Sequence, residues 1–356
     1  MALLAASRSV TIIVRVKTVM NRGKNMEIER HEVEGESLIT LKSHSGLTLT
    51  LSPFGAGIYS ITYLDKPMTS EPLSPKDYVS STGYYGKTAG RIAGRISNSI
   101  LDFDGKKYKV SSNEGPNCLH GGNRGLAFQE WSFSLNDEGE QISADFILDS
   151  KDQDNGFPGD VRFLVRYILS DKEPVFRIVY QYMADKDTPI NLTSHTYFNL
   201  GGEITIEGHL LTLPALGVES YTPDLIPLGM GKVAPALDFS SPKAIGKDIN
   251  DPLLHLTRTN GYDHAFLFDK KEGRADLTLE SEHFKMSIVT SLPAVQVYSA
   301  NYPSSVIMNT GKKDLPHSGV AIEPVFVPGD YESMRAKANE KKEEFIEYAF
   351  SSKEEK

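Results

Sequence analysis

The stretch "ISADFILDSKDQDNGFPGDVRFLVRYIL", residues 142–169, contains two runs of strand-forming residues around a short polar connection. The connection holds Asp154, Asn155, Gly156, Pro158 and Gly159, which are residue types that favour tight turns. Aliphatic and aromatic residues alternate or run together on both sides of it, as they do in β-strands. The two runs are therefore predicted to pair as an antiparallel hairpin.

Similar short runs recur from about Lys42 onward, separated by Gly, Pro, Asn and Asp. They include "LTLTLSPFGAGIYSITYL", "VFRIVYQYM", "HAFLFD", "AVQVYSAN" and "VAIEPVFV". Helical periodicity is almost absent, and no change of composition marks a second domain. Many strands without alternating helices predict an all-β fold, a sandwich or a barrel, in a single domain over residues 26–356.

Composition narrows the class of protein. The 356 residues include one cysteine, Cys118, and carry a formal net charge of -9. A single thiol excludes an internal disulfide framework and fits a reducing compartment, and an acidic chain is not expected to bind nucleic acid. No apolar run is long enough to span a membrane. The nine histidines include no pair at the spacing of a helical zinc site, so we expect no catalytic metal.

The first 25 residues, "MALLAASRSVTIIVRVKTVMNRGKN", contain Arg and Lys but no acidic residue. A secretory signal is not favoured, because Arg8 and Arg15 interrupt the apolar stretches. An organellar transit peptide is weakly compatible with this composition. We prefer an upstream start codon, with the working protein beginning near Met26, and expect residues 1–25 to be poorly ordered.

Two segments carry candidate catalytic residues. "NLTSHTYFNL", residues 191–200, reads as a strand whose odd positions, including His195 and Tyr197, form a polar face. Glu323 lies in a strand that is apolar on both faces, where desolvation raises the pKa of a carboxyl group and makes it a candidate general base. A buried ion pair with Arg95 would explain Glu323 equally well. Pro324 predicts that this position lies at the end or edge of its strand.

Four further segments place polar residues among strands or glycines. The spacing in "GRIAGRI" puts Arg91 and Arg95 on one face of either a strand or a helix. The other candidates are His120, which precedes two glycines in "NCLHGG", Asp263, which begins an apolar run, and Gln296 and Tyr298, which alternate with valines. Each has a simpler explanation as a solvated, ion-paired or turn-forming residue.

Taken in order, "GRIAGRI", "NCLHGG", "DNGFPGD", "NLTSHTYFNL", "GYDHAF", "QVYSAN" and "AIEP" resemble the aldose 1-epimerases, also called galactose mutarotases, from about Ser45 to the C-terminus. The resemblance implies a large antiparallel β-sandwich, the galactose mutarotase-like supersandwich, with a concave polar cleft. It also implies that free hexoses are converted between their α and β anomers without a cofactor.

The resemblance assigns roles residue by residue. Glu323 matches the general base that takes the proton of the anomeric hydroxyl, and His195 matches the general acid that protonates the ring oxygen. Arg95, His120, Asp263 and Gln296 match positions that contact the sugar, and Tyr197 would share the cleft-facing side of His195. Gly94 and Val325 depart from residues common in the family, and Pro328, Gly329 and Asp330 stand where the family often has Pro-Asp, which leaves the preferred sugar open.

We therefore expect a cytoplasmic aldose 1-epimerase that acts on galactose or glucose as a monomer or weak homodimer. The nearest alternative is a hexose-6-phosphate mutarotase, which would need basic residues for the phosphate, with Arg91 and Arg95 as the obvious candidates. From another class of protein, a non-catalytic sugar-binding protein on the same fold is the second alternative, because a fold does not determine function.

Overall fold

The computed structural model describes residues 14–16, 26–255 and 259–353. Strands dominate it, and all pairings between the strands named below are antiparallel. The predicted hairpin is present: β13 (Gln141–Ser150) pairs with β14 (Val161–Ser170) in an unbroken register from Gln141↔Ser170 to Ser150↔Val161. The connection of residues 151–160 therefore lets the two strands pair as the predicted antiparallel hairpin.

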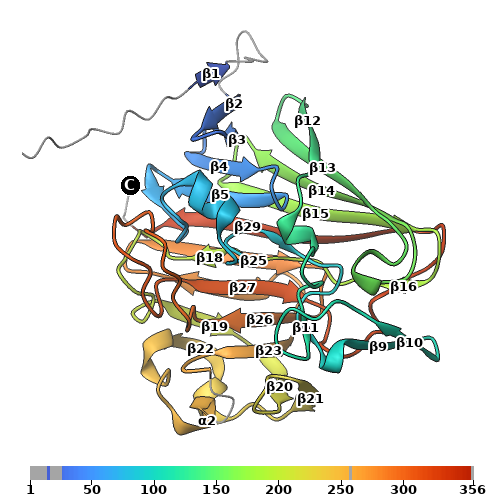
Figure 1. Ribbon diagram of the computed structural model, residues 1–356. Coiled ribbons are helices and arrows are strands. Elements are labelled where there is room, and N and C mark those ends of the chain that lie inside the picture. Colours follow the sequence, from blue (N-terminus) through green and yellow to red (C-terminus); the bar gives the residue numbers. More distant parts are fainter. Residues whose placement is uncertain (1–13, 17–25, 256–258, 354–356) are drawn as a thin grey trace, which may run out of the picture.

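Three sheets form most of the molecule (Figure 1). The largest has nine strands in the order β12 (Ser132–Asp137), β13, β14, β15 (Val175–Ala184), β29 (Lys341–Ser352), β25 (Phe284–Thr290), β24 (Leu277–Glu280), β19 (Leu210–Leu213) and β22 (Phe239–Ala244). The second, here called the pocket sheet, has the order β18 (Tyr197–Phe198), β27 (Val320–Val325), β26 (Ala294–Tyr298), β23 (Asp263–Phe268), β20 (Ala215–Tyr221) and β21 (Pro227–Gly231). The third contains β1 (Val14–Val16), β2 (Glu27–Val33), β3 (Glu36–Lys42), β4 (Leu47–Ser52), β5 (Gly57–Tyr63) and β6 (Lys66–Pro67).

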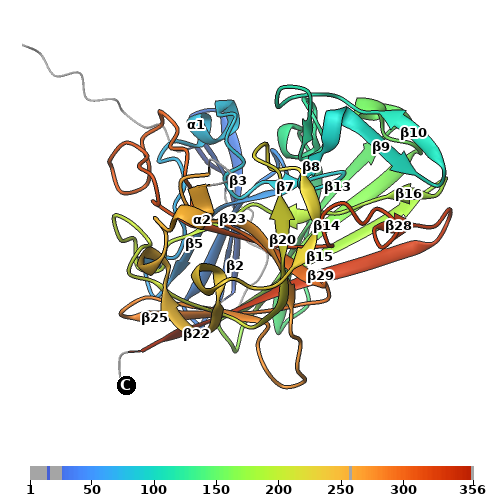
Figure 2. The same cartoon turned by 90° about the horizontal axis from the view of Figure 1, so that it is seen from below.

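Short elements complete the fold. The two-stranded pairs are β7 (Thr88–Ala89) with β17 (Thr193–Ser194), β8 (Arg95–Ile96) with β11 (Cys118–Leu119), β9 (Ile100–Phe103) with β10 (Lys106–Lys109), and β16 (Thr188–Pro189) with β28 (Arg335–Ala336). The described α-helices are α1 (Pro75–Ser80) and α2 (Pro252–His255), and no helix of the described residues is long and apolar enough to cross a membrane. The β9–β10 hairpin projects from one side of the molecule in both ribbon views (Figure 2).

The main hydrophobic core lies between the nine-stranded sheet and the pocket sheet. Ile178 of β15 and Tyr348 of β29 join Val320 and Ile322 of β27 in one buried cluster. Because side chains alternate across a strand, Ala321 and Glu323 face away from the core that Val320 and Ile322 enter. Glu323 is thereby directed to the outer face of the pocket sheet. The predicted antiparallel sandwich is confirmed.

The expectations about chain organisation remain predictions. Most of residues 1–25 lies outside the described residues, with Val14–Val16 as the exception, which pair with β2. The main core cluster includes residues from Met26 to Phe350. This span is what a single domain over residues 26–356 requires.

The prediction of one continuous strand over residues 191–200 is wrong. Thr193 and Ser194 pair with β7, whereas Tyr197 and Phe198 pair with β27 in the pocket sheet. Between them His195 donates its backbone N–H to the Lys87 carbonyl at 3.0 Å and accepts from the Gly86 N–H at 2.9 Å. The chain therefore passes from one sheet to another at His195. The alternation of polar and apolar residues in the sequence could not predict this, because the contacts that redirect the chain come from the distant residues 86 and 87.

Candidate active site

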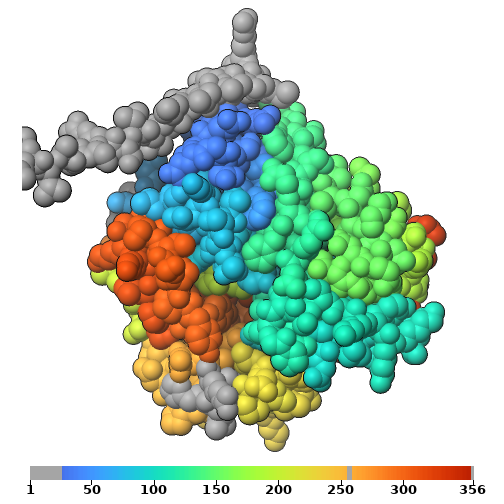
Figure 3. Space-filling view, viewed as in Figure 1, coloured from blue at the N-terminus to red at the C-terminus, as the bar shows by residue number. Residues whose placement is uncertain are grey.

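A pocket with a cavity volume of about 250 Å³ opens on the outer face of the pocket sheet. Figure 3 shows a hollow near the centre of this face, where cyan-to-teal, yellow and orange segments meet. All seven residues assigned to a site from the sequence line this pocket: Arg95, His120, His195, Tyr197, Asp263, Gln296 and Glu323. The fold thus brings together residues that are up to 228 positions apart, from 95 to 323.

Glu323 lies on β27 with only 2% of its surface exposed. The register of β26 and β27 places Gln296 directly opposite it. Burial raises the pKa of Glu323 well above its ordinary value, and the nearby Asp263 acts in the same direction. Pro324 has a paired strand, β26, on one side only. On the other side β18 pairs with Val320 and Ala321 but ends before Pro324, so the predicted edge position holds for that side.

His195 is an ionisable partner of Glu323. Its Nε2 lies 3.5 Å from Glu323 Oε1, and both side chains are more than nine-tenths buried. The ring of Tyr84 stacks on the imidazole with centroids 5.5 Å apart. Burial lowers the pKa of His195 to about 4. A buried acid–base pair with opposite pKa shifts is typical of catalytic sites.

His120 lines the pocket as a hydrogen-bond donor. Its Nδ1 accepts from the Gly94 N–H at 3.2 Å, and its own backbone N–H donates to the Gly94 carbonyl at 3.0 Å. Burial, followed by the effects of His195 and Arg95, lowers the pKa of His120 well below its ordinary value. The ring is therefore neutral, and because Nδ1 accepts, Nε2 carries the hydrogen.

This tautomer bears on metal binding. One donor atom each from His120, His195 and Glu323 lie within 4.8 Å of one another, close enough to surround an ion. A metal-binding histidine usually donates its second ring N–H to an acceptor, whereas the second nitrogen of His120 accepts a hydrogen bond from Gly94. The hydrogen-bond pattern of His120 therefore fits a donor to an oxygen ligand better than a metal ligand.

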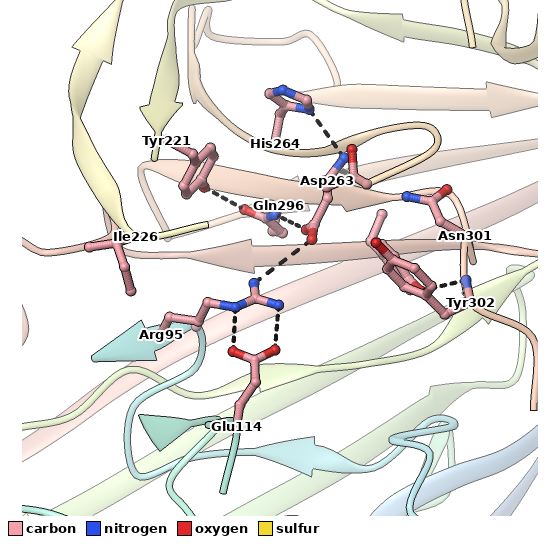
Figure 4. Close-up of polar contacts among 12 residues, drawn as sticks. Arg95, Glu114, Tyr221, Ile226, Asp263, His264, Gln296, Asn301 and Tyr302 are labelled. Atoms are coloured by element: carbon pink, nitrogen blue, oxygen red, sulfur yellow. Dashed lines mark hydrogen bonds and ion pairs between the residues drawn. The ribbon is translucent and has the colours of Figure 1, made fainter. Parts of the chain in front are cut away.

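Arg95 begins a chain of contacts along the pocket wall (Figure 4). Its Nε and NH2 donate to the two carboxylate oxygens of Glu114 at 2.7 and 2.8 Å, and its NH1 lies 3.8 Å from Asp263 Oδ2. Gln296 Nε2 donates to Asp263 Oδ1 at 2.5 Å, and the Tyr221 hydroxyl donates to Gln296 Oε1 at 3.1 Å. These contacts fix the orientation of the Gln296 amide.

The ion pair considered between Arg95 and Glu323 is therefore replaced by pairs with Glu114 and Asp263. Desolvation raises the pKa of Asp263, although Arg95 and the Gln296 hydrogen bond oppose that effect. Glu114 and Asp263 thus pair with the Arg95 guanidinium, which also acts electrostatically on Glu323. The pocket is rich in oxygen acceptors.

The predicted common face for Arg91 and Arg95 is wrong. Arg91 is 3% exposed and makes five hydrogen bonds: its Nε and NH2 donate to Ser150 Oγ, its NH2 also to the Lys151 carbonyl, and its NH1 to the carbonyls of Pro158 and Gly159. Only Arg95 and Ile96 of this segment form a strand, so neither regular period applies. Arg91 anchors the connection of the predicted hairpin instead of lining the pocket.

Three residues that the sequence did not single out also line the pocket: Tyr84, Glu114 and Tyr221. Tyr84 comes from the loop before β7 and lies against His120, with centroids 4.6 Å apart, as well as against His195. Glu114 comes from a turn, and Tyr221 ends β20. The pair of tyrosines before Gly86 was the only local feature of the sequence that could have drawn attention to Tyr84. No periodicity of the sequence marked Glu114 or Tyr221 as pocket residues.

In this antiparallel β-sandwich, buried imidazoles, carboxyl groups and one arginine line a single pocket, as expected of a galactose mutarotase-like β-protein. The family profile for aldose 1-epimerase matches residues 37–347. The chain is 33% identical over 308 residues to an aldose 1-epimerase of Escherichia coli, covering 82% of this chain and 86% of that protein. It is 33% identical to human galactose mutarotase, covering 69% and 71%.

Solved structures agree with the sequence comparisons. A galactose 1-epimerase of Lactobacillus acidophilus superimposes with a TM-score of 0.82 at 25% identity, over 96% of this chain and 99% of that one. A GalM/aldose epimerase homologue of C. elegans gives a TM-score of 0.80 at 28% identity, over 89% of this chain and 99% of that one. The chain belongs to the aldose 1-epimerase family.

Proposed function

We propose that Glu323 and His195 open and reclose the ring of free aldohexoses, such as galactose and glucose, in this pocket. The chain is an isomerase of the aldose 1-epimerase class, which interconverts the α and β anomers of aldoses. The substrate preference, the proton-transfer roles and the sugar contacts are the proposed part.

The reaction needs one base and one acid on the same sugar. The Glu323 carboxylate takes the proton of the anomeric hydroxyl, the C1–O5 bond breaks, and the imidazolium of His195 gives its proton to O5. C1 becomes an aldehyde carbon and turns about the C1–C2 bond. O5 then adds to the other face of C1 while the two residues exchange roles, so the enzyme ends with the proton inventory with which it began.

The contact between Glu323 and His195 carries this proposal. Burial favours the neutral form of both groups, so in the free enzyme, between their two pKa values, the pair holds one proton, which lies on the carboxyl group. Transfer of that proton to His195 gives the reactive carboxylate and imidazolium. Their mutual attraction in a buried site offsets part of the desolvation penalty of forming these two charges.

The other lining residues suit the hydroxyl groups of a sugar. Arg95 and the Nε2–H of His120 supply donors, Asp263 supplies an acceptor, and the Gln296 amide supplies one of each. Tyr197 packs beside His195 with ring centroids 5.0 Å apart. These groups would hold the pyranose so that O1 and O5 meet the acid–base pair.

A hexose 6-phosphate is not the favoured substrate. Arg91 is buried away from the pocket, and Arg95 already binds two carboxylates. The pocket therefore lacks the cluster of basic residues that a phosphate requires.

Polarimetry on freshly dissolved α-galactose and α-glucose tests the proposal. We expect the protein to accelerate the change of optical rotation above the spontaneous rate, in proportion to enzyme concentration. Boiled protein is the control. A panel that adds other aldoses would rank the sugars, and no acceleration with any neutral aldohexose would contradict the proposal.

We also propose that the protein works in the cytoplasm as a monomer or weak homodimer. Cys118, the single cysteine, is buried and free, which supports a reducing compartment. Sedimentation velocity over a range of concentrations measures the assembly directly. A tight oligomer at submicromolar concentration would contradict the second half of this proposal.

A further inference from the structure

The charge balance around Arg95 indicates what the pocket rejects. Among the described residues that line the pocket, Arg95 is the only lysine or arginine. His120 and His195 are neutral there because burial lowers the pKa of both rings. A negatively charged substrate would therefore depend on this one guanidinium for its electrostatic attraction.

Glu114 already occupies the face of Arg95 that an anion would use. Its carboxylate binds Nε and NH2 with two nearly parallel hydrogen bonds of 2.7 and 2.8 Å. This fork-to-fork geometry is the one with which arginine recognises carboxylates and phosphates in ligands. In Figure 4 the guanidinium lies between Glu114 on one side and Asp263 on the other.

Uncharged sugars do not meet the same obstacle. A guanidinium has five N–H donors, and Glu114 takes two of them. The remaining donors are enough for hydroxyl groups, which need a hydrogen bond but no net positive charge. A carboxylate or phosphate brought beside Glu114 would instead meet a like charge next to the largely buried Arg95.

The surroundings of Glu114 suit a role in selection more than a role in folding. The side chain is 37% exposed, whereas those of Arg95 and Asp263 are 17% and 10% exposed. Its backbone belongs to a tight turn in which Glu114 and Asn117 exchange N–H to carbonyl bonds of 3.0 and 3.1 Å. A change at its side chain leaves this turn and the core untouched.

We propose that Glu114 is a specificity-determining residue that neutralises Arg95 and so excludes anionic aldoses, namely uronates and sugar phosphates, from the pocket. This inference rests on the proposed function, since it concerns which aldoses reach Glu323 and His195. It assigns to Glu114 a role that the acid–base reaction itself does not require.

The test compares neutral and anionic substrates in the wild type and in Glu114→Gln. The glutamine keeps the size of the side chain and one carbonyl acceptor for Arg95 but removes the charge. Anomerisation is measured at pH 7 by NMR exchange for galactose against galacturonate and for glucose against glucose 6-phosphate. Glu347→Gln is the matched control, because Glu347 also binds an arginine, Arg177, but lies on β29 outside the pocket.

In the wild type we expect kcat/KM for each anionic sugar to be at least tenfold below that of its neutral partner. In Glu114→Gln the ratio of anionic to neutral kcat/KM should rise at least tenfold, mainly through a lower KM for the anion, and the gain should shrink as salt is added. Glu347→Gln should leave both ratios unchanged.

Two results would overturn the proposal. One is an unchanged ratio in Glu114→Gln, and the other is an equal loss for neutral and anionic sugars, which would make Glu114 only a support for Arg95. If the wild type fails to act on the neutral sugars, the proposed function itself has failed. The neutral arm of the same experiment therefore separates the two failures.

Discussion

At the scale of single residues, the main feature of the site is a buried acid–base pair. Glu323 and His195 are buried together with 3.5 Å between Oε1 and Nε2, and burial shifts the two pKa values in opposite directions. The two titrations belong to the pair, since each charge changes the energy of the other. A pair that holds one proton between its two pKa values can run ring opening and closure in both directions.

The pH dependence of kcat/KM follows from this arrangement. The pKa of His195 is lowered to about 4, so lowering the pH from 7 to 5 does not add a second proton to the pair. We expect protonation of His195 to cause no loss of kcat/KM for anomerisation over that interval and to lower it only near pH 4, because kcat/KM reports the ionisations of the free enzyme. The measurement is the rate at low substrate concentration, with the spontaneous rate subtracted at each pH. A decrease with its midpoint near 6.5, the ordinary histidine value, would contradict the account.

Residue types predicted part of the site. Glu323 was visible in the sequence because a carboxylate between apolar neighbours is unusual, and the structure places it at 2% exposure. Residue type alone made Glu323 a candidate general base, whereas the role of His195 as general acid came from the resemblance of whole motifs. The partners of Arg95 were not predictable, because Glu114 and Asp263 reach it from a turn and from a different sheet.

At the scale of elements, strand alternation gave most of the correct predictions. Gln296 and Tyr298 face the pocket, whereas Val295 and Val297 join the core, as a period of two requires. The "NLTSHTYFNL" segment shows the limit of this reasoning. Its polar positions His195 and Tyr197 do line the pocket, but two different strands carry its two halves, because hydrogen bonds with residues 86 and 87 redirect the chain.

The two arginines of "GRIAGRI" should respond differently to the same substitution. Arg91→Gln leaves Ser150 and three carbonyl acceptors of the buried connection without their donor. We expect it to lower the free energy of unfolding by about 3 kcal/mol, the range for breaking a buried charged network. The kcat of the folded fraction should be unchanged, since Arg91 does not line the pocket.

Arg95→Gln is the matched comparison and should do the reverse, with raised KM and a smaller change in stability. Urea unfolding and active-site-normalised kinetics on both variants measure the two effects. A large loss of kcat in Arg91→Gln without loss of stability would show that Arg91 has a direct part in the reaction.

At the scale of the whole molecule, the core and the pocket lie on opposite faces of the same sheet. Ile322 is fully buried in the main cluster, and the next residue, Glu323, faces the pocket. The site is therefore built on elements whose position is fixed by the packing behind them, which favours precise geometry. Sequence reasoning predicted the class of fold at this scale, but the crossing of the chain between sheets depends on long-range contacts.

Cooperative unfolding tests the prediction of one domain over residues 26–356. The single tryptophan, Trp131, is 1% exposed in the main cluster and reports on the core, whereas activity reports on the pocket. We expect fluorescence, far-ultraviolet circular dichroism and activity to be lost at the same urea concentration, as in a two-state transition. Activity lost at clearly lower urea than the fluorescence change would show that the pocket sheet unfolds separately.

The central claim is that Glu323 is the base that exchanges its proton with the sugar, and Glu323→Gln tests it most directly. Glutamine keeps the shape of the side chain in a 2% exposed position but cannot take up a proton. Polarimetry with freshly dissolved α-galactose should give a kcat reduced by about 10²–10⁴, with circular dichroism unchanged and Glu347→Gln as the matched control. A Glu323→Gln enzyme that keeps more than about a tenth of the wild-type kcat would contradict the account.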